Sequence, residues 1–268
     1  MKLSSGAVEF GQLRDGIHRS VRADGGRVFV KVRRNMPADF FLAEARGLAA
    51  LSSASLRVPD VLSVWEYGIG LEDLGDGHAS ARDWEKAGHE LAGLHRIAGM
   101  HFGFAARGWC GDSEQDNTPD TDGFRFFAER RLLPQGRRAF DAGLLERGDI
   151  GRLESLCARL RELLPERPPV LVHGDLWRGN LHVCANGELA LIDGGAVHYG
   201  WAEGDLAMLI LFGEPPIAFF TAYEADAGID ASWRRHATLL NLYHQLNHLN
   251  LFGASYLDGV RAVLQRYS

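Results

Sequence analysis

The stretch LVHGDLWRGN, at residues 171–180, is the most informative segment of this chain. An apolar run precedes His-Gly-Asp, and Asn180 stands five residues after Asp175. A second apolar run, residues 189–192, leads directly into Asp193. Taken singly, these three polar residues could be a loop cap, a turn residue and the start of an Asp-Gly hairpin turn. That interpretation does not explain their joint spacing.

The spacing suits the transfer of a phosphoryl group and is typical of phosphotransferases with a kinase fold. The reaction needs a carboxylate that orients the acceptor hydroxyl and accepts its proton, a role that we assign to Asp175. It also needs hard oxygen ligands for Mg²⁺ beside the β- and γ-phosphates of ATP. A hairpin-like turn can bring Asn180 and Asp193 to opposite sides of one ion, so we expect both to be metal ligands.

The N-terminal region supports the same chemistry. Residues 27–32 (RVFVKV) follow an Asp-Gly-Gly turn at 24–26 and are rich in β-branched residues, which predicts a strand. Lys31 has the position of the lysine that holds the α- and β-phosphates, and Glu44 lies on the following predicted helix, where its partner is expected. The alternatives are a solvated edge lysine and an ordinary surface glutamate.

We therefore predict an α+β, protein-kinase-like fold with two lobes. Residues 1–74 would form a small β-rich, nucleotide-binding lobe that ends in a hinge. Residues 75–268 would form a larger, mostly helical lobe with the catalytic loop and the acceptor site. Apolar spacing predicts a helix over 38–53 and strands over 61–67 and 69–71. Further helices are expected over 81–98, 121–145, 149–164, 203–225 and 231–267, interrupted by a strand pair around 170–193.

The composition excludes several other classes of protein. A net charge of −6 and a pI near 6.0 argue against a nucleic-acid or anionic-membrane partner. No apolar run reaches the roughly 18 residues of a membrane span, and the N-terminus lacks the apolar region of a secretory signal. Three scattered cysteines suit a reducing cytoplasm better than a disulfide framework or a zinc site. We expect a cytoplasmic monomer.

Two strings are distinctive, HGDLWRGN at 173–180 and LNHLNLFG at 246–253. The first resembles the catalytic loop, and the second a family-specific segment, of the fructosamine kinase (ketosamine 3-kinase) family, a relative of the aminoglycoside and choline phosphotransferases. The resemblance covers nearly the whole chain, and the other matching segments are 94–96, Gly111 with Gln115 and Asn117, 126–135, 192–193, 199–200, 205–208 and 211–213.

The resemblance implies phosphorylation of a sugar hydroxyl on a ketosamine, with ATP and Mg²⁺ as cofactors. The ketosamine, the rearranged product of a sugar and an amine, could be a small molecule or linked to protein. Because the family's 3-phosphate product is unstable, the implied biological role is the repair of glycated amines. The implied site residues are Asp175 as base, Asn180 and Asp193 as metal ligands, Lys31 with its partner Glu44 at the phosphates, and Glu72, Asp73 and Leu74 as the adenine-side hinge.

The chain also departs from the family pattern. The loop expected to cover the phosphates, residues 11–20, has two glycines and does not match G-x-G-x-x-G, although backbone amides of residues 14–17 could still contact phosphate oxygens. Gly194 stands where the family usually has proline after the metal aspartate, and Trp201-Ala202 replaces a charged pair. These departures leave nucleotide affinity and substrate choice open.

Other polar and aromatic residues have simpler interpretations. His244 and His248 have the spacing of a zinc protease helix, but Gln245 stands where that motif has glutamate, which favours a packed or substrate-facing helix. Asp205 could approach the catalytic loop or the substrate, but a carboxylate at a helix N-terminus is the simpler interpretation. The side chains expected to line either the acceptor pocket or the core are Trp177 and Trp201, and those expected on a solvated helix face are Arg125, Arg130, Arg131, Arg137 and Arg138.

Two alternatives remain open at this point. One is another small-molecule kinase of the same fold, acting on an aminoglycoside, choline or a different amino sugar. The other is a pseudokinase that binds a nucleotide or a partner without turnover, for which the glycine-poor loop is the only support. The choice among ribulose, erythrulose and fructose adducts depends on single contacts of ~1–3 kcal/mol, which the sequence does not reveal.

Overall fold

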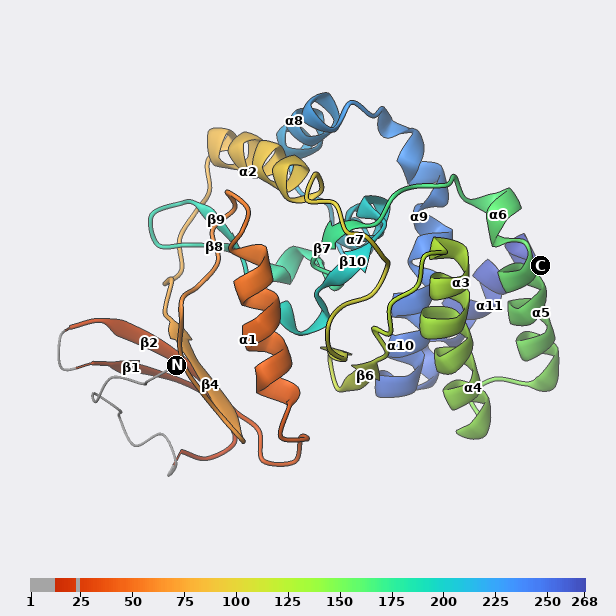
Figure 1. The fold of residues 1–268 in the computed structure, drawn as a ribbon, viewed down its shortest axis with the longest axis horizontal. Coiled ribbons are helices and arrows are strands. Elements are labelled where there is room, and N and C mark those ends of the chain that lie inside the picture. Colours follow the sequence, from red (N-terminus) through yellow and green to blue (C-terminus); the bar gives the residue numbers. More distant parts are fainter. Residues whose placement is uncertain (1–12, 23–24) are drawn as a thin grey trace.

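A computed structural model describes residues 13–22 and 25–268, which form a small lobe built on a sheet and a larger helical lobe (Figure 1). The sheet of the small lobe is antiparallel, and its strand order is β1-β2-β4-β3. Its members are β1 (Gly16–Val21), β2 (Arg27–Val32), β3 (Val61–Trp65) and β4 (Gly68–Glu72). The turn predicted at 24–26 lies partly outside the described residues.

The faces of β2 and of α1 (Phe40–Leu51) determine how the small lobe packs. In β2 the valines at 28, 30 and 32 are buried, so Lys31 points to the opposite face of the sheet. Helix α1 buries residues at helical spacing, among them Phe41, Glu44, Leu48 and Leu51. The strand and the helix thus present Lys31 and Glu44 to the same space.

The larger lobe is mostly helical, and in Figure 1 it occupies the right-hand part of the molecule. Helix α2 begins with a capping box, in which Ser80 and Asp83 bond each other's backbone amides, and it packs along α8 at Gly88. The helices of this lobe are α2 (Ala81–Leu94), α3 (Gly123–Phe127), α4 (Leu133–Asp141), α5 (Arg147–Ala158), α6 (Leu160–Leu163), α7 (Ala202–Leu209), α8 (Ile217–Ala227), α9 (Arg234–Leu240), α10 (Leu242–Phe252) and α11 (Leu257–Tyr267).

Short strand pairs carry the motif residues of this lobe. Strand β7 (Val170–Val172) pairs with β10 (His198–Gly200), and β8 (Leu181–Val183) pairs with β9 (Leu189–Leu191). A third pair, β5 (Gly108–Cys110) and β6 (Ser113–Gln115), contacts α1, and Asn247 of α10 donates to the Cys110 carbonyl oxygen at 3.1 Å. The predicted pair around 170–193 is therefore a β8–β9 hairpin, while β7 finds its partner after Asp193.

Several predicted helices were too long. The segment predicted as one helix over 203–225 is two helices, since α7 ends at Leu209 and α8 begins at Ile217, and the connection contains Gly213, with φ of +127°, and Pro215-Pro216, which cannot donate backbone hydrogen bonds. The segment 231–267 breaks at Gly253, whose φ of +86° lies outside the helical region. The segment 121–145 contains a π-helical turn, Ala128–Leu132, between α3 and α4.

Candidate active site

A cavity of about 350 Å³ lies between the lobes and brings together the residues of the sequence motifs. Strand β2 and helix α1 line one side of it, and the segments that follow β7 and β9 line the other. The predicted site residues on its wall are Lys31, Glu44, Asp175, Asn180 and Asp193. A cavity between two lobes with converging polar groups is a common form of ligand site.

Lys31 lies at the centre of the charged groups in this cavity. Its ammonium donates to Glu44 Oε1 at 2.8 Å and also contacts Asp193 Oδ1. The Glu44 side chain is buried, whereas the Asp193 side chain is 46% exposed to solvent. Glu44 therefore fixes the lysine from the protein side, while the partly exposed Asp193 faces the opening of the cleft.

The backbone at Asp193 and Gly194 is tightly constrained. Asp193 has φ 61° and ψ 58°, and it is the only non-glycine residue with positive φ in the described part of the chain. Such conformations are uncommon for non-glycine residues and cluster at functional sites. Next to it, α1 approaches so closely that a Cβ on Gly47 would lie 1.8 Å from the carbonyl oxygen of Gly194. The glycine at 194 therefore belongs to the contact that holds α1 against this loop.

The β8–β9 hairpin sets the relative position of Asn180 and Asp193. The Ile192 amide donates to the Asn180 carbonyl oxygen at 3.1 Å, so the two motif residues flank the same end of the hairpin. The Asn180 amide nitrogen donates to the backbone oxygen of Asp175 at 2.8 Å, which leaves its Oδ1 for another partner. His173 Nε2 donates to the Ile192 carbonyl oxygen at 2.7 Å and joins the two loops. Asn180 Oδ1 and the Asp193 carboxylate are hard oxygen donors of the kind that Mg²⁺ prefers.

Asp175 occupies a more enclosed position, with its side chain 21% exposed. Burial and, to a smaller extent, the negative charge of Asp205 raise the pKa of Asp175 to about 7, against the opposing effect of a hydrogen bond with the Cys110 thiol. A carboxyl group whose pKa lies near neutral pH can accept a proton efficiently under physiological conditions.

Asp205, at the start of α7, holds the catalytic loop from behind. Its carboxylate accepts hydrogen bonds from the backbone amides of His173 at 2.7 Å and Gly174 at 2.9 Å, and from His95 Nε2 at 3.2 Å. His95 in turn contacts the Tyr223 hydroxyl at 2.8 Å. Burial raises the pKa of Asp205, but the hydrogen bonds and charge of His95 outweigh it and hold that pKa below its ordinary value. Asp205 is a carboxylate in the first turn of α7, as expected, and it also bonds the catalytic loop, which was the alternative that the sequence left open.

The predicted hinge residues lie at the far end of the cleft. Glu72, Asp73 and Leu74 line a second cavity of about 270 Å³, which shares Lys31 and Asp193 with the first. The Glu72 carboxylate binds Arg57, and the Asp73 carboxylate accepts from Arg27 at 3.0 Å and from the Gly75 amide at 2.9 Å. Both carboxylates are therefore engaged within the protein, as are the backbone amides of Glu72 and Asp73.

The loop predicted to cover the phosphates is only partly described, since residues 11 and 12 lie outside the described residues. Asp15 accepts from the Arg34 backbone amide at 3.1 Å and from its guanidinium at 2.9 Å. This contact joins the start of β1 to the end of β2. Ile17 lies on the walls of both cavities and is 67% exposed.

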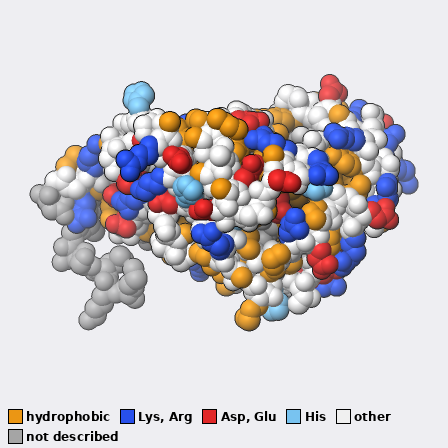
Figure 2. Space-filling model, turned by 90° about the horizontal axis from the view of Figure 1, so that it is seen from above, with side chains coloured by type: hydrophobic (Ala, Val, Ile, Leu, Met, Phe, Trp, Pro, Cys, Tyr) orange, Lys and Arg blue, Asp and Glu red, His pale blue; other side chains and the backbone are white. Residues whose placement is uncertain are grey.

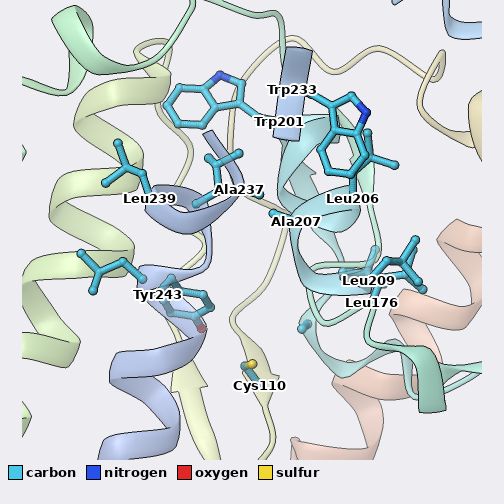
Figure 3. Packing of buried hydrophobic residues seen from close by; sticks show 14 of the residues in the cluster. Cys110, Leu176, Trp201, Leu206, Ala207, Leu209, Trp233, Ala237, Leu239 and Tyr243 are labelled. Carbon is cyan, nitrogen blue, oxygen red and sulfur yellow. The ribbon is translucent and has the colours of Figure 1, made fainter. Parts of the chain in front are cut away.

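Some residues outside the motifs were misjudged from the sequence. Arg131 was expected on a solvated face, but it is buried and donates to Asn117 Oδ1 at 2.7 Å. Burial lowers the pKa of Arg131 to about 10. Trp201 is part of the buried hydrophobic cluster (Figure 3) and packs against Phe124, whereas Trp177 is 40% exposed and lines the cleft. The burial of Arg131 depends on the aromatic rings that cover it, and the sequence does not show which rings these are.

The surface carries charged side chains of both signs (Figure 2), as the mixed acidic and basic composition leads us to expect. On the face shown in Figure 2, acidic and basic side chains are interspersed rather than gathered by sign. Among the described residues, no helix has the length and apolar character needed to cross a membrane.

Comparison with known proteins gives one family along the whole chain. A family profile described as fructosamine kinase matches residues 4–268. A protein of Synechocystis sp., named a probable ketoamine kinase, is 35% identical over 251 residues, which is 90% of this chain and 82% of that protein. A chloroplastic protein-ribulosamine 3-kinase of Arabidopsis thaliana is 30% identical over 259 residues, covering 92% of this chain and 77% of that protein.

Solved structures give the same result for the fold. A fructosamine-3-kinase-type protein from Thermobifida fusca superimposes with a TM-score of 0.86 at 35% identity, covering 94% of this chain and 92% of that one. An ADP-bound aminoglycoside phosphotransferase superimposes with a TM-score of 0.58 at 17% identity, covering 96% of this chain and 94% of that one, which supports the fold alone. The predicted α+β, protein-kinase-like fold with two lobes is confirmed.

Proposed function

The chain belongs to the fructosamine kinase family, and on this premise we propose how its cleft works. The family resemblance seen in the motifs is confirmed, and the protein is a phosphotransferase that uses ATP and acts on a sugar hydroxyl of a ketosamine. The observation that carries the residue assignment is the convergence of Lys31, Asp175, Asn180 and Asp193 on one cavity between the lobes.

Asp175 is the proposed base. It would orient the acceptor hydroxyl and accept its proton as the phosphoryl group is transferred. Its raised pKa supports this role, since a base with a pKa of about 7 is matched to neutral pH. The amide bonds that Asp205 accepts from residues 173 and 174 would keep this loop in position while the acceptor binds.

Lys31 and the hinge are the proposed nucleotide contacts. Lys31, held by Glu44 at 2.8 Å, would bind the α- and β-phosphates, and the backbone of residues 72–74 would contact the adenine. Asn180 Oδ1 and the Asp193 carboxylate would hold Mg²⁺, because hard oxygen donors suit that ion. Mg²⁺ bound there would neutralise the charge that develops on the transferred phosphoryl group.

The wider biological assignments are proposals too. Deglycation of small molecules or of protein side chains would follow from the instability of the phosphorylated product. A cytoplasmic location is supported by the scattered cysteines, none of which is in a disulfide among the described residues. A monomeric state is the simplest arrangement for a cleft lined by residues of one chain, and sedimentation would test it.

The decisive experiment measures Mg-ATP consumption with ribulose-lysine and fructose-lysine adducts as acceptors. We expect turnover with at least one adduct, and a loss of about 100-fold or more in Asp175→Asn, with ATP affinity retained. Asp141→Asn, on the exposed end of α4, is the matched control and should keep full activity. Near-normal turnover by Asp175→Asn would overturn the role of this residue. Turnover with amino-sugar or aminoglycoside acceptors alone would overturn the ketosamine assignment.

A further inference from the structure

Three potential metal ligands from separate elements, one of them the proposed base Asp175, converge at one edge of the site. Cys110 ends β5, Asp175 follows β7 and His244 lies on α10, and their ligand atoms all lie within 4.8 Å of one another. Cys110 Sγ is 3.9 Å from His244 Nδ1, which is 3.8 Å from Asp175 Oδ1. We propose that these three side chains form a binding site for Zn²⁺, distinct from the proposed Mg²⁺ pair, and that the bound ion inhibits the enzyme reversibly.

The separations fit a tetrahedral zinc ion after a small contraction. Zinc lies about 2.3 Å from a cysteine sulfur and about 2.0–2.2 Å from histidine nitrogen or carboxylate oxygen, so tetrahedral ligands stand about 3.4–3.6 Å apart. The observed 3.8 and 3.9 Å separations need to close by a few tenths of an ångström, and the Cys110–Asp175 pair, which lies within 4.8 Å, by about 1.3 Å at most. Rotation of the side chains can supply a movement of this size without shifting the backbone.

The chemistry of the donors selects a soft or borderline metal. Sulfur and imidazole ligands favour Zn²⁺ over Mg²⁺, which prefers oxygen ligands alone. Binding would release the proton of the Cys110 thiol to solvent, and the resulting thiolate and the Asp175 carboxylate would together balance the two positive charges of the ion. This balance matters because Cys110 and His244 are both buried, and Arg131 lies near enough to disfavour an unbalanced cation.

The surroundings of the sulfur suit a bound thiolate. Asn247, one turn along α10 from Tyr243, donates through Nδ2 to Cys110 Sγ at 3.4 Å and to the Cys110 carbonyl oxygen at 3.1 Å. Figure 3 shows the Cys110 side chain beside α10, from which Tyr243 projects. Hydrogen bonds from a neighbouring group orient metal ligands and strengthen binding. Strand β5 carries Cys110, and the Asn247 side chain of α10 holds it in place through these hydrogen bonds.

The inhibitory part of this inference rests on the proposed function of Asp175. A carboxylate that binds Zn²⁺ cannot also accept the proton of the acceptor hydroxyl. The ion should therefore compete with the acceptor and leave ATP affinity unchanged, since Lys31 and the hinge do not contribute ligands. The pair His244 and His248, which the sequence suggested as a zinc motif, is not the site, because the partners of His244 come from other elements.

Metal binding can be tested without turnover by titrating the metal-free protein with Co²⁺, which shows a charge-transfer absorption band when bound to a thiolate. We expect this band in the wild-type protein and in Cys184→Ser, which removes another buried cysteine. Cys110→Ser should lose the band. His244→Gln should weaken Co²⁺ binding at least about tenfold, whereas His248→Gln should leave it unchanged. Circular dichroism would establish that each variant is folded.

The absence of a thiolate band in the wild-type protein, or its persistence in Cys110→Ser, would overturn the site. Because this titration uses no substrate, its outcome is independent of whether the ketosamine assignment holds. In a second experiment, Zn²⁺ should inhibit wild-type turnover competitively with the acceptor, and the concentration for half inhibition should rise at least about tenfold in Cys110→Ser. Equal sensitivity of the two proteins, or competition with ATP instead, would overturn the inhibitory role.

Discussion

The cleft in front of the catalytic loop, residues 173–180, and the packing behind that loop are held by different kinds of interaction. On the cleft side, Lys31 contacts Glu44 and Asp193, and the Asp193 carboxylate remains nearly half exposed. On the opposite side, the Asp205 carboxylate is 2% exposed and accepts from two loop amides and from His95. The cleft side can exchange partners with a ligand, whereas the opposite side is a closed set of bonds.

This difference separates the expected effects of mutation. A partly exposed ion pair is screened by solvent and contributes little to stability, so its loss should be seen in binding and catalysis. A buried carboxylate whose partners are then left without an acceptor is costly to remove, so its loss should be seen in unfolding. The contrast predicts that the cleft in front of the loop serves catalysis and that the packing behind it serves stability.

The largest effect should follow from Asp205→Ala. Two backbone amides and His95 would lose their buried acceptor, and the free energy of unfolding should fall by about 3–5 kcal/mol. Asp205→Asn keeps one acceptor oxygen and should lose less. Urea denaturation of both variants would measure the difference. A decrease below 1 kcal/mol for the alanine variant would erase the contrast between the two sides of the loop.

Asp193→Ala should affect the cleft side without unfolding the protein. The proposed metal ligand would be lost, so Mg²⁺-dependent nucleotide binding should disappear and kcat/KM should fall by about 100-fold or more. Calorimetric titration with ATP, with and without Mg²⁺, would measure this loss. The melting temperature without nucleotide should stay within a few degrees of the wild type. A variant that binds Mg-ATP normally would contradict the ligand role.

The same contrast explains what could be read from the sequence. The fold class and the positions of α1, β2 and β4 follow from apolar spacing and were correctly predicted, because local patterns reflect which face is buried. The motif residues Lys31, Asp175 and Asp193 were selected by their spacing, and the structure brings them to one cavity. Their chemical roles stay predictions until the mutants are measured.

The closed side of the loop could not be read in this way. Asp205 bonds residues 30 or more positions earlier, and no local pattern encodes such a pairing. Arg131 shares its sequence spacing with exposed arginines, and its burial follows only from the packing of Phe126 and Tyr243 around it. The break at Pro215 and Pro216, by contrast, was visible in the sequence and should have ended the predicted helix.

Gly47→Ala tests whether the cleft side depends on the approach of α1. The added Cβ would meet the Gly194 carbonyl oxygen at 1.8 Å, so α1 must move and carry Glu44 away from Lys31. We expect a loss of about 1–3 kcal/mol in unfolding free energy, together with weaker ATP binding. Gly151→Ala is the matched control, because a Cβ there meets nothing within 4 Å and should stabilise α5 by up to ~1 kcal/mol. Unchanged ATP affinity in Gly47→Ala would show that Lys31 binds the nucleotide without α1 in this position.

The smallest effect concerns the pH dependence of stability, through a buried histidine behind the loop. Burial, assisted by the charge of Arg131, lowers the pKa of His198 to about 3, whereas the unfolded chain takes up this proton near pH 6.5. The unfolded state therefore binds more protons between these values, so stability is fully present above pH 6.5 and falls as the pH decreases. Between pH 6.5 and 5.5, His198 should contribute a loss of roughly 1 kcal/mol.

Urea denaturation of wild-type and His198→Gln protein at several pH values would measure this contribution. The variant should lose stability less steeply below pH 6.5, while His101→Asn, which changes an exposed histidine, should follow the wild-type curve. Parallel curves for wild type and His198→Gln would mean that the ring is protonated in the folded protein. In that event the region behind the loop would tolerate a buried positive charge, and it would differ from the cleft in its location but not in its ability to hold charged groups.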